Sequence, residues 1–71
     1  MKLVIRQERI SRGWSQEYIA KEIGITAESV HYIETAQRKP SYEVLVKLED
    51  LFQLSHRQLF AVADDNPNSH L

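Results

Sequence analysis

A chain of 71 residues can form one small domain, and it has no cysteine, which excludes disulfide bonds and thiolate chemistry. Its longest apolar runs are far too short to cross a bilayer, and its first nine residues carry too few apolar side chains for a signal peptide, so we expect a cytoplasmic protein. The net charge is −1, and the charges are unevenly distributed. Residues 1–48 hold eight basic and six acidic side chains, whereas residues 49–71 hold one basic and four acidic side chains.

The first predicted helix covers residues 3–12 and is followed by Gly13, which suits the left-handed position after a helix end. A second helix follows Ser15 and a third follows Thr26, and both of these residues are good N-caps. Gly24 makes the tight turn between the two helices. Their apolar residues fall at helical spacing and are Ile19, Ala20, Ile23, Ile25, Val30 and Ile33. Two short helices joined in this way form a helix-turn-helix, whose second helix can enter the major groove of DNA.

Four predicted helices share one arrangement at their first turn. A Ser or Thr N-cap is preceded by an apolar residue or proline and followed, four positions later, by another apolar residue, as in a hydrophobic staple. The N-caps are Ser15, Thr26, Ser41 and Ser55, the preceding residues are Trp14, Ile25, Pro40 and Leu54, and the following ones are Ile19, Val30, Leu45 and Leu59. The pattern predicts helices that begin near residues 16, 27, 42 and 56, with the last two ending at about 52 and 61.

No strand signal is present, so the chain is predicted to be an all-α domain of five helices over residues 1–62. From residue 63 onward the apolar periodicity stops, which predicts a flexible tail over residues 63–71. His31, His56 and His70 are too scattered for a metal site, and the nearest acid pair lies in the predicted tail. We therefore expect no enzyme, no metal, no cofactor and no small-molecule ligand.

A further set of residues matches a known family. These residues are Arg9, Gln16, Ala20, Gly24, Val30, Ile33 and Glu34, followed by Arg38, Lys39, Pro40 and Ser41. Over roughly residues 3–60, the chain resembles the Cro/phage-repressor class of helix-turn-helix domains, called XRE-type. The resemblance implies a compact lambda-repressor-like fold with the helix-turn-helix as its second and third helices. The family usually has an apolar residue where this chain has Glu8, so we expect Ile10 to take over part of that packing.

The resemblance implies that the helix over residues 27–35 lies in the major groove of double-stranded DNA. The residues expected to contact bases are Ala27, Glu28, His31 and Tyr32. The residues expected to contact the DNA backbone are Gln16, Thr26, Ser29, Thr35, Arg38, Lys39 and Ser41. For Gln16, Arg38 and Lys39 the alternative is a solvated side chain without a partner.

Two features depart from this pattern. Glu28 could accept a hydrogen bond from cytosine N4, but it is equally explained as an acid that the helix dipole favours at the second helical position. Thr35 and Ala36 stand where the family commonly has Asn-Gly. Either Ala36 adopts a left-handed conformation at a cost of roughly 1 kcal/mol, or the helix continues for another turn.

The family also implies an internal ion pair between Arg9 and Glu34, although on base rates each alone is more often a surface residue. Because the family usually dimerises, Phe52, Phe60 and Val62 are candidate dimer contacts, unless they close the core of the monomer. We expect a sequence-specific DNA-binding transcriptional regulator of the phage, prophage or mobile-element repressor type. The alternative is a helix-turn-helix module that binds another regulator protein and has lost most of its affinity for DNA.

Overall fold

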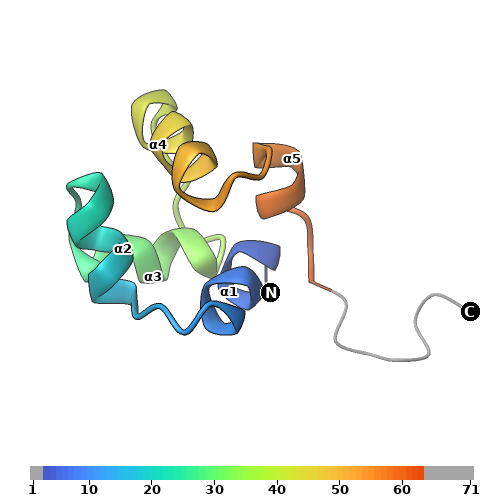
Figure 1. Cartoon of the computed structure of the whole chain (residues 1–71). Helices are drawn as coiled ribbons and strands as arrows, with labels where there is room; N and C mark the ends of the chain where they lie inside the picture. Colours follow the sequence, from blue (N-terminus) through green and yellow to red (C-terminus); the bar gives the residue numbers. More distant parts are fainter. Residues whose placement is uncertain (1–2, 64–71) are drawn as a thin grey trace, which may run out of the picture.

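The computed structural model describes residues 3–63, so only Ala63 of the predicted tail is included, and residues 1–2 and 64–71 lie outside the described range. Within that range the chain forms five helices and no strand (Figure 1), which confirms the predicted all-α fold. The helices are α1 (Val4–Ser11), α2 (Gln16–Ile23), α3 (Ala27–Glu34), α4 (Tyr42–Phe52) and α5 (His56–Leu59). The last of them is shorter than predicted.

The four predicted helix starts are confirmed at residues 16, 27, 42 and 56. In each case the N-cap hydroxyl oxygen accepts a hydrogen bond from the backbone N–H three residues later. The N···O distances are 2.9 Å for Ser15, 3.0 Å for Thr26, 3.2 Å for Ser41 and 3.3 Å for Ser55. The first helix lacks a side-chain cap, and the Val4 N–H instead donates to the Ala61 carbonyl at 2.9 Å. This bond ties the start of α1 to the segment after α5.

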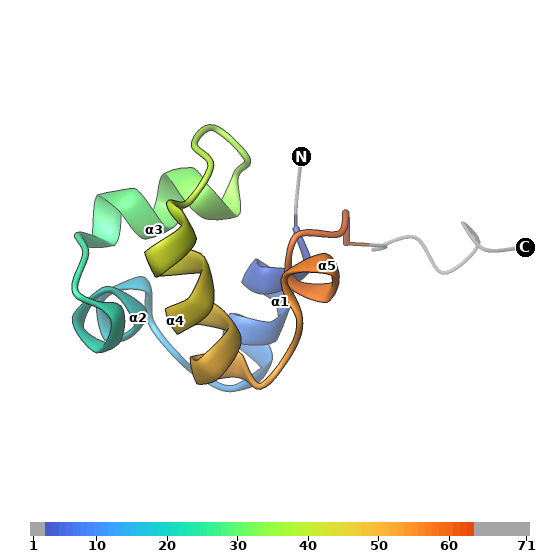
Figure 2. The ribbon, with the colours of Figure 1, turned by 90° about the horizontal axis from the view of Figure 1, so that it is seen from above.

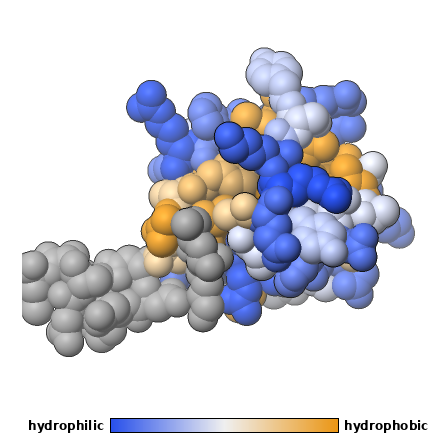
Figure 3. All heavy atoms as spheres, turned by 180° about the vertical axis from the view of Figure 1, so that it is seen from behind, coloured by the Kyte–Doolittle hydropathy of each residue, from blue (hydrophilic) through white to orange (hydrophobic). Residues whose placement is uncertain are grey.

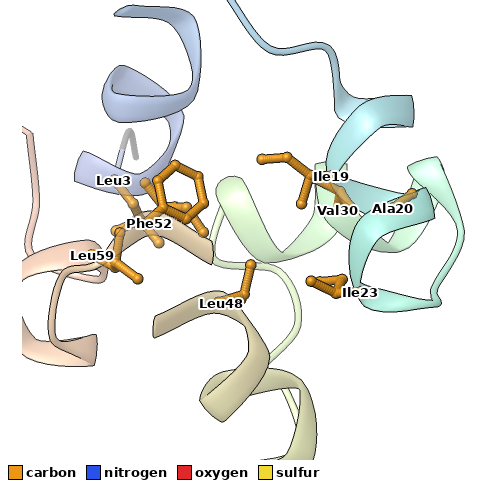
Figure 4. Packing of buried hydrophobic residues seen from close by; sticks show 9 residues of the cluster. Leu3, Ile19, Ala20, Ile23, Val30, Leu48, Phe52 and Leu59 are labelled. Atoms are coloured by element: carbon orange, nitrogen blue, oxygen red, sulfur yellow. The ribbon is translucent and has the colours of Figure 1, made fainter. Parts of the chain in front are cut away.

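One apolar cluster fills the space between the helices (Figure 4). It consists of Leu3, Ile5, Ile19, Ala20, Ile23, Val30, Leu48, Phe52 and Leu59. The ring of Trp14 packs on Phe52 with 5.3 Å between centroids. The guanidinium of Arg12 lies 5.0 Å from the centroid of the Phe52 ring and donates to the Phe52 carbonyl at 3.0 Å. Arg12 therefore fastens the end of α1 to the end of α4.

The structure contradicts a dimer role for Phe52, which instead closes the core of the monomer, and it contradicts the packing role expected for Ile10. Phe52, a candidate dimer contact from the sequence, is only 1% exposed, because it lies one turn after Leu48 on the buried side of α4. Ile10, expected to help pack the first helix, is 51% exposed. Leu3 and Ile5 provide that packing instead, since the start of α1 is the part tied to the segment after α5.

The third helix ends at Glu34, so the alternative in which it continues for another turn is wrong. Ala36 adopts the left-handed conformation, with a φ of 63°. The Ala36 N–H donates to the Ile33 carbonyl at 3.2 Å and the Gln37 N–H donates to the Tyr32 carbonyl at 2.9 Å, the two bonds of a Schellman motif. These bonds satisfy carbonyls that a helix end would otherwise leave unpaired, which offsets the cost of a left-handed alanine.

Candidate nucleic-acid interface

The helices α2 and α3 form the predicted helix-turn-helix. Gly24 ends α2 with a φ of 78°, a conformation that side-chain-bearing residues rarely adopt. The N–H groups of Gly24 and Ile25 both donate to the Ala20 carbonyl, at 2.8 and 2.9 Å. The turn directs α3 along one edge of the molecule, and the loop over residues 35–41 continues that edge (Figure 2). Figure 3 views the molecule from this side, where hydrophilic side chains gather across the centre of the face.

The third helix has a buried side and an exposed side. Its buried residues are Val30, Ile33 and Glu34. Its exposed residues are Glu28 and His31, while Ser29, Tyr32 and the following Thr35 are partly exposed. Ala27, expected to contact bases, lies one turn before Val30, is partly buried and packs against the core. The structure therefore places Ala27 at the edge of the outward surface and not within it.

A buried carboxylate holds α3 in place. Glu34 is 1% exposed and accepts hydrogen bonds from Arg9 Nε at 2.6 Å, from Arg9 Nη2 at 3.2 Å and from Gln16 Nε2 at 3.2 Å. Arg9 Nη1 also donates to the Trp14 carbonyl at 2.8 Å. Arg9 and Glu34 thus lie together as the resemblance implies, and the bonds join α1, the start of α2 and the end of α3.

Gln16 is the first residue of α2, and its amide is held by Glu34 instead of extending freely into solvent. The side-chain amide nitrogen carries two hydrogens, and the Glu34 carboxylate accepts a hydrogen bond from one of them. The second hydrogen can be donated to a phosphate oxygen. An amide that is already fixed loses little side-chain entropy when it makes such a contact.

Two of the hydroxyl residues expected on the DNA backbone are engaged within the protein. Thr26 Oγ1 accepts from the Ser29 N–H and donates to Ser29 Oγ at 2.8 Å. Thr35 Oγ1 donates to the His31 carbonyl at 3.0 Å and accepts from Gln37 Nε2 at 2.9 Å. A phosphate oxygen needs a donor, and both hydroxyl hydrogens are already used. Thr26 and Thr35 therefore position α3, while the Ser29 hydroxyl, which accepts from Thr26, keeps its own hydrogen for a ligand.

The loop between α3 and α4 carries two cations. Arg38 folds back on α3, with Nη1 3.3 Å from Ser29 Oγ and Cζ 5.3 Å from the centroid of the Tyr32 ring. Lys39 is exposed beside it. Ser41 uses its hydroxyl oxygen to cap α4, so its hydroxyl hydrogen is not needed for the cap. The loop thus presents positive charge along the edge formed by α3.

The sequence did not single out Tyr42, which is 81% exposed at the first position of α4. It follows directly on Ser41 and the basic loop in the chain. An aromatic side chain at the first position of a helix that follows two cations was the signal that could have identified it.

The other two apolar residues predicted as dimer contacts lie after α5. Phe60 packs partly against the core, and Val62 is 63% exposed.

The second ion pair of note is on α4 and α5. The Glu49 carboxylate accepts hydrogen bonds from the His56 backbone N–H at 2.7 Å and from His56 Nδ1 at 2.9 Å. The bonds from the side chain and the backbone of His56 hold the pKa of Glu49 below its ordinary value of 4.5, because they stabilise the ionised form. Glu49 therefore caps the start of α5 as an anion.

Among residues 3–63, no group of three or more His, Cys, Asp or Glu side chains is close enough together to hold a metal ion. No helix within that range combines the length and the apolar character needed to cross a membrane.

Comparison with known proteins agrees with the geometry. A family model described as helix-turn-helix matches residues 5–59, from α1 to the end of α5. The chain therefore belongs to the XRE-type helix-turn-helix family that its sequence resembles. It is also similar to a protein of Archaeoglobus fulgidus named as an uncharacterized HTH-type transcriptional regulator, with 29% identity over 65 residues that cover 92% of this chain and 93% of the relative. No solved structure matches the chain.

Proposed function

We propose that this protein is a sequence-specific DNA-binding transcriptional regulator that places α3 in the major groove. The observation that carries the proposal is the two-sided character of α3: Val30, Ile33 and Glu34 fix its inner side, and its outer side is open. A short helix presented in this way is the element with which helix-turn-helix proteins reach base edges. The family match and the similarity to the Archaeoglobus fulgidus protein support the same function.

The outward residues divide into two groups by their chemistry. The candidate base contacts are Glu28, His31 and Tyr32, with the Ala27 methyl at the edge of the surface. The candidate backbone contacts are Gln16, Ser29, Lys39 and Ser41, joined by Tyr42. Each member of the second group except Lys39 offers a neutral donor, so the sequence-independent attraction to phosphate depends strongly on Lys39 and on the positive charge of Arg38 beside it.

The affinity of one such small surface is modest, so we propose that the protein binds DNA as a homodimer. Val62 and the exposed part of Phe60 form the apolar surface that a second copy would cover. Two-fold symmetry then predicts a pseudo-palindromic site with half-sites about one helical turn apart. A dimer bound at such an operator would act as a repressor by occupying it. The phage, prophage or mobile-element origin rests on the resemblance alone.

Selection of bound duplexes from a random pool, followed by a salt titration on the selected duplex, tests the proposal. We expect the logarithm of the binding constant to fall linearly with the logarithm of the salt concentration. Lys39→Ala should reduce the magnitude of that slope by about 1. The matched control is Lys47→Ala on α4, an exposed lysine whose nearest carboxylate is Glu43 at 3.6 Å, and it should leave the slope unchanged. A flat salt response with no enriched sequence would refute the proposal.

Glu28 favours a second candidate function, because an exposed carboxylate at the start of α3 repels phosphates. In that case the open side of α3 would bind another regulator protein. Absence of DNA binding at low salt, together with co-purification of one defined protein partner that Glu28→Gln releases, would support this function over the first.

A further inference from the structure

Arg38 belongs to the surface of α3 although it lies in the loop after it. Its guanidinium reaches back to Ser29, the third residue of the helix, and covers the ring of Tyr32, the sixth. The Arg38 backbone N–H also donates to the Tyr32 carbonyl at 3.2 Å, which fixes the loop at the point from which the side chain returns. The cation therefore lies alongside the middle of α3, between Ser29 and Tyr32, in the stretch that also carries the proposed base contact His31.

The guanidinium of Arg38 has the donors needed to pair with a base edge. The group is planar and has five N–H donors, of which the Ser29 hydroxyl takes one. The guanidinium also lies against the Tyr32 ring, with Cζ 5.3 Å from the ring centroid, so two contacts hold it on α3 while its remaining N–H donors are left for a ligand. Arginine with a free edge is the side chain that donates two parallel hydrogen bonds to O6 and N7 of guanine.

The neighbouring Lys39 differs from Arg38 in how its charge is held. Lys39 is exposed in the same loop, and its ammonium is a point charge on a flexible chain, which suits a phosphate at any position along the backbone. Arg38 packs on α3, so its side chain has less conformational freedom than that of Lys39. A side chain held in this way is suited to a ligand at a defined place and angle. We propose that Arg38 is a specificity-determining residue that reads one guanine of the half-site, with Tyr32 and Ser29 as the residues that position it.

This inference rests on the proposed DNA-binding function, and Arg38→Lys tests it because that substitution keeps the charge and removes the planar fork. Wild-type protein should lose affinity by about 5- to 150-fold when 7-deazaguanine, which lacks N7, replaces one particular guanine of the selected duplex. Arg38→Ala should bind the normal and substituted duplexes equally, whereas Arg38→Lys should show a smaller difference between them with an unchanged salt slope. Tyr32→Phe keeps the ring and should retain the preference, whereas Tyr32→Leu should lose it, with no further loss when combined with Arg38→Lys.

Circular dichroism and thermal melting confirm that each variant is folded before binding is measured. The inference is overturned if Arg38→Ala keeps every base preference of the wild type and only reduces the salt slope equally on all duplexes, which is the behaviour of a phosphate contact. Failure of the proposed function gives a different result, because wild-type protein then enriches no sequence at all. That result removes the assignment of Arg38 as well.

Discussion

Arg9 of α1 and Glu34 of α3 are joined by two hydrogen bonds, Nε to Oε2 at 2.6 Å and Nη2 to Oε1 at 3.2 Å, although 25 positions separate them in the chain. The paired geometry fixes both the distance and the rotation between the two side chains. Since Glu34 ends α3, the two bonds set the position of this helix relative to the rest of the domain.

Breaking this pair should destabilise the fold. Arg9→Met leaves the Glu34 carboxylate buried without its cation, and we expect the free energy of unfolding to fall by about 3–5 kcal/mol. Combining Arg9→Met with Glu34→Leu should recover most of that loss, because an apolar replacement of both partners removes the buried charge. Urea unfolding, followed by circular dichroism, measures the free energy of unfolding of the single and the double variant. A loss below about 1 kcal/mol for Arg9→Met would mean that the pair behaves like an exposed one.

Ala36→Gly should stabilise the protein. Ala36 has a positive φ, which costs an alanine about 1–2 kcal/mol, whereas glycine adopts it freely but loses more entropy on folding. The net gain should be about 0.5–1 kcal/mol, seen as a rise of several degrees in Tm. Ala61→Gly is the control, since its φ is not positive, and it should not raise Tm. An unchanged or lower Tm for Ala36→Gly would contradict the argument.

Thr26→Ala should weaken the fold without changing the electrostatics of DNA binding. Loss of the N-cap of α3 costs about 1 kcal/mol, and Thr26→Ser should restore it because the hydroxyl is kept. The Thr26 hydroxyl hydrogen goes to Ser29, so the salt slope of DNA binding should match that of the wild type. If Thr26→Ala instead weakens the binding of the folded protein to every duplex by the same factor, with the salt slope unchanged, the hydroxyl contacts a phosphate as the sequence suggested.

Glu49 should make stability depend on pH on the acid side. Its pKa is lowered in the folded state by the bonds from His56, so its contribution is fully present above the ordinary value of 4.5 and is lost as the pH falls through the lower, folded value. Glu49→Gln should therefore flatten the acid limb of a plot of Tm against pH. Glu43→Gln, which removes an exposed carboxylate of α4, should leave that limb as it is in the wild type.

The parts of the fold that the sequence predicted are those decided locally. The starts of α2 to α5 depend on a Ser or Thr and its neighbours within four residues, and all four are confirmed. The end of α3 was left open, because the choice between a left-handed Ala36 and a longer helix depends on two loop N–H groups finding the Tyr32 and Ile33 carbonyls.

The parts that the sequence did not predict depend on contacts between distant segments. Phe52 and Ile10 are both apolar residues of predicted helices, yet one is buried and the other exposed. Their difference arises from how α1 meets α4 and α5, which no local pattern specifies. The position of Arg38 is of the same kind: its residue type predicted a cation in the loop, but the return of its side chain to Tyr32 follows from the loop conformation.

The separation of the two sides of α3 has a consequence for how such proteins diverge. The contacts that hold the helix come from Val30, Ile33 and Glu34, whereas Glu28 and His31 face outward and contribute little to packing. Substitutions at the outward positions can therefore accumulate without a penalty in folding. With α3 reading DNA as proposed, a gene duplicate could acquire a different operator through a handful of surface changes, while the scaffold that presents the helix stays the same.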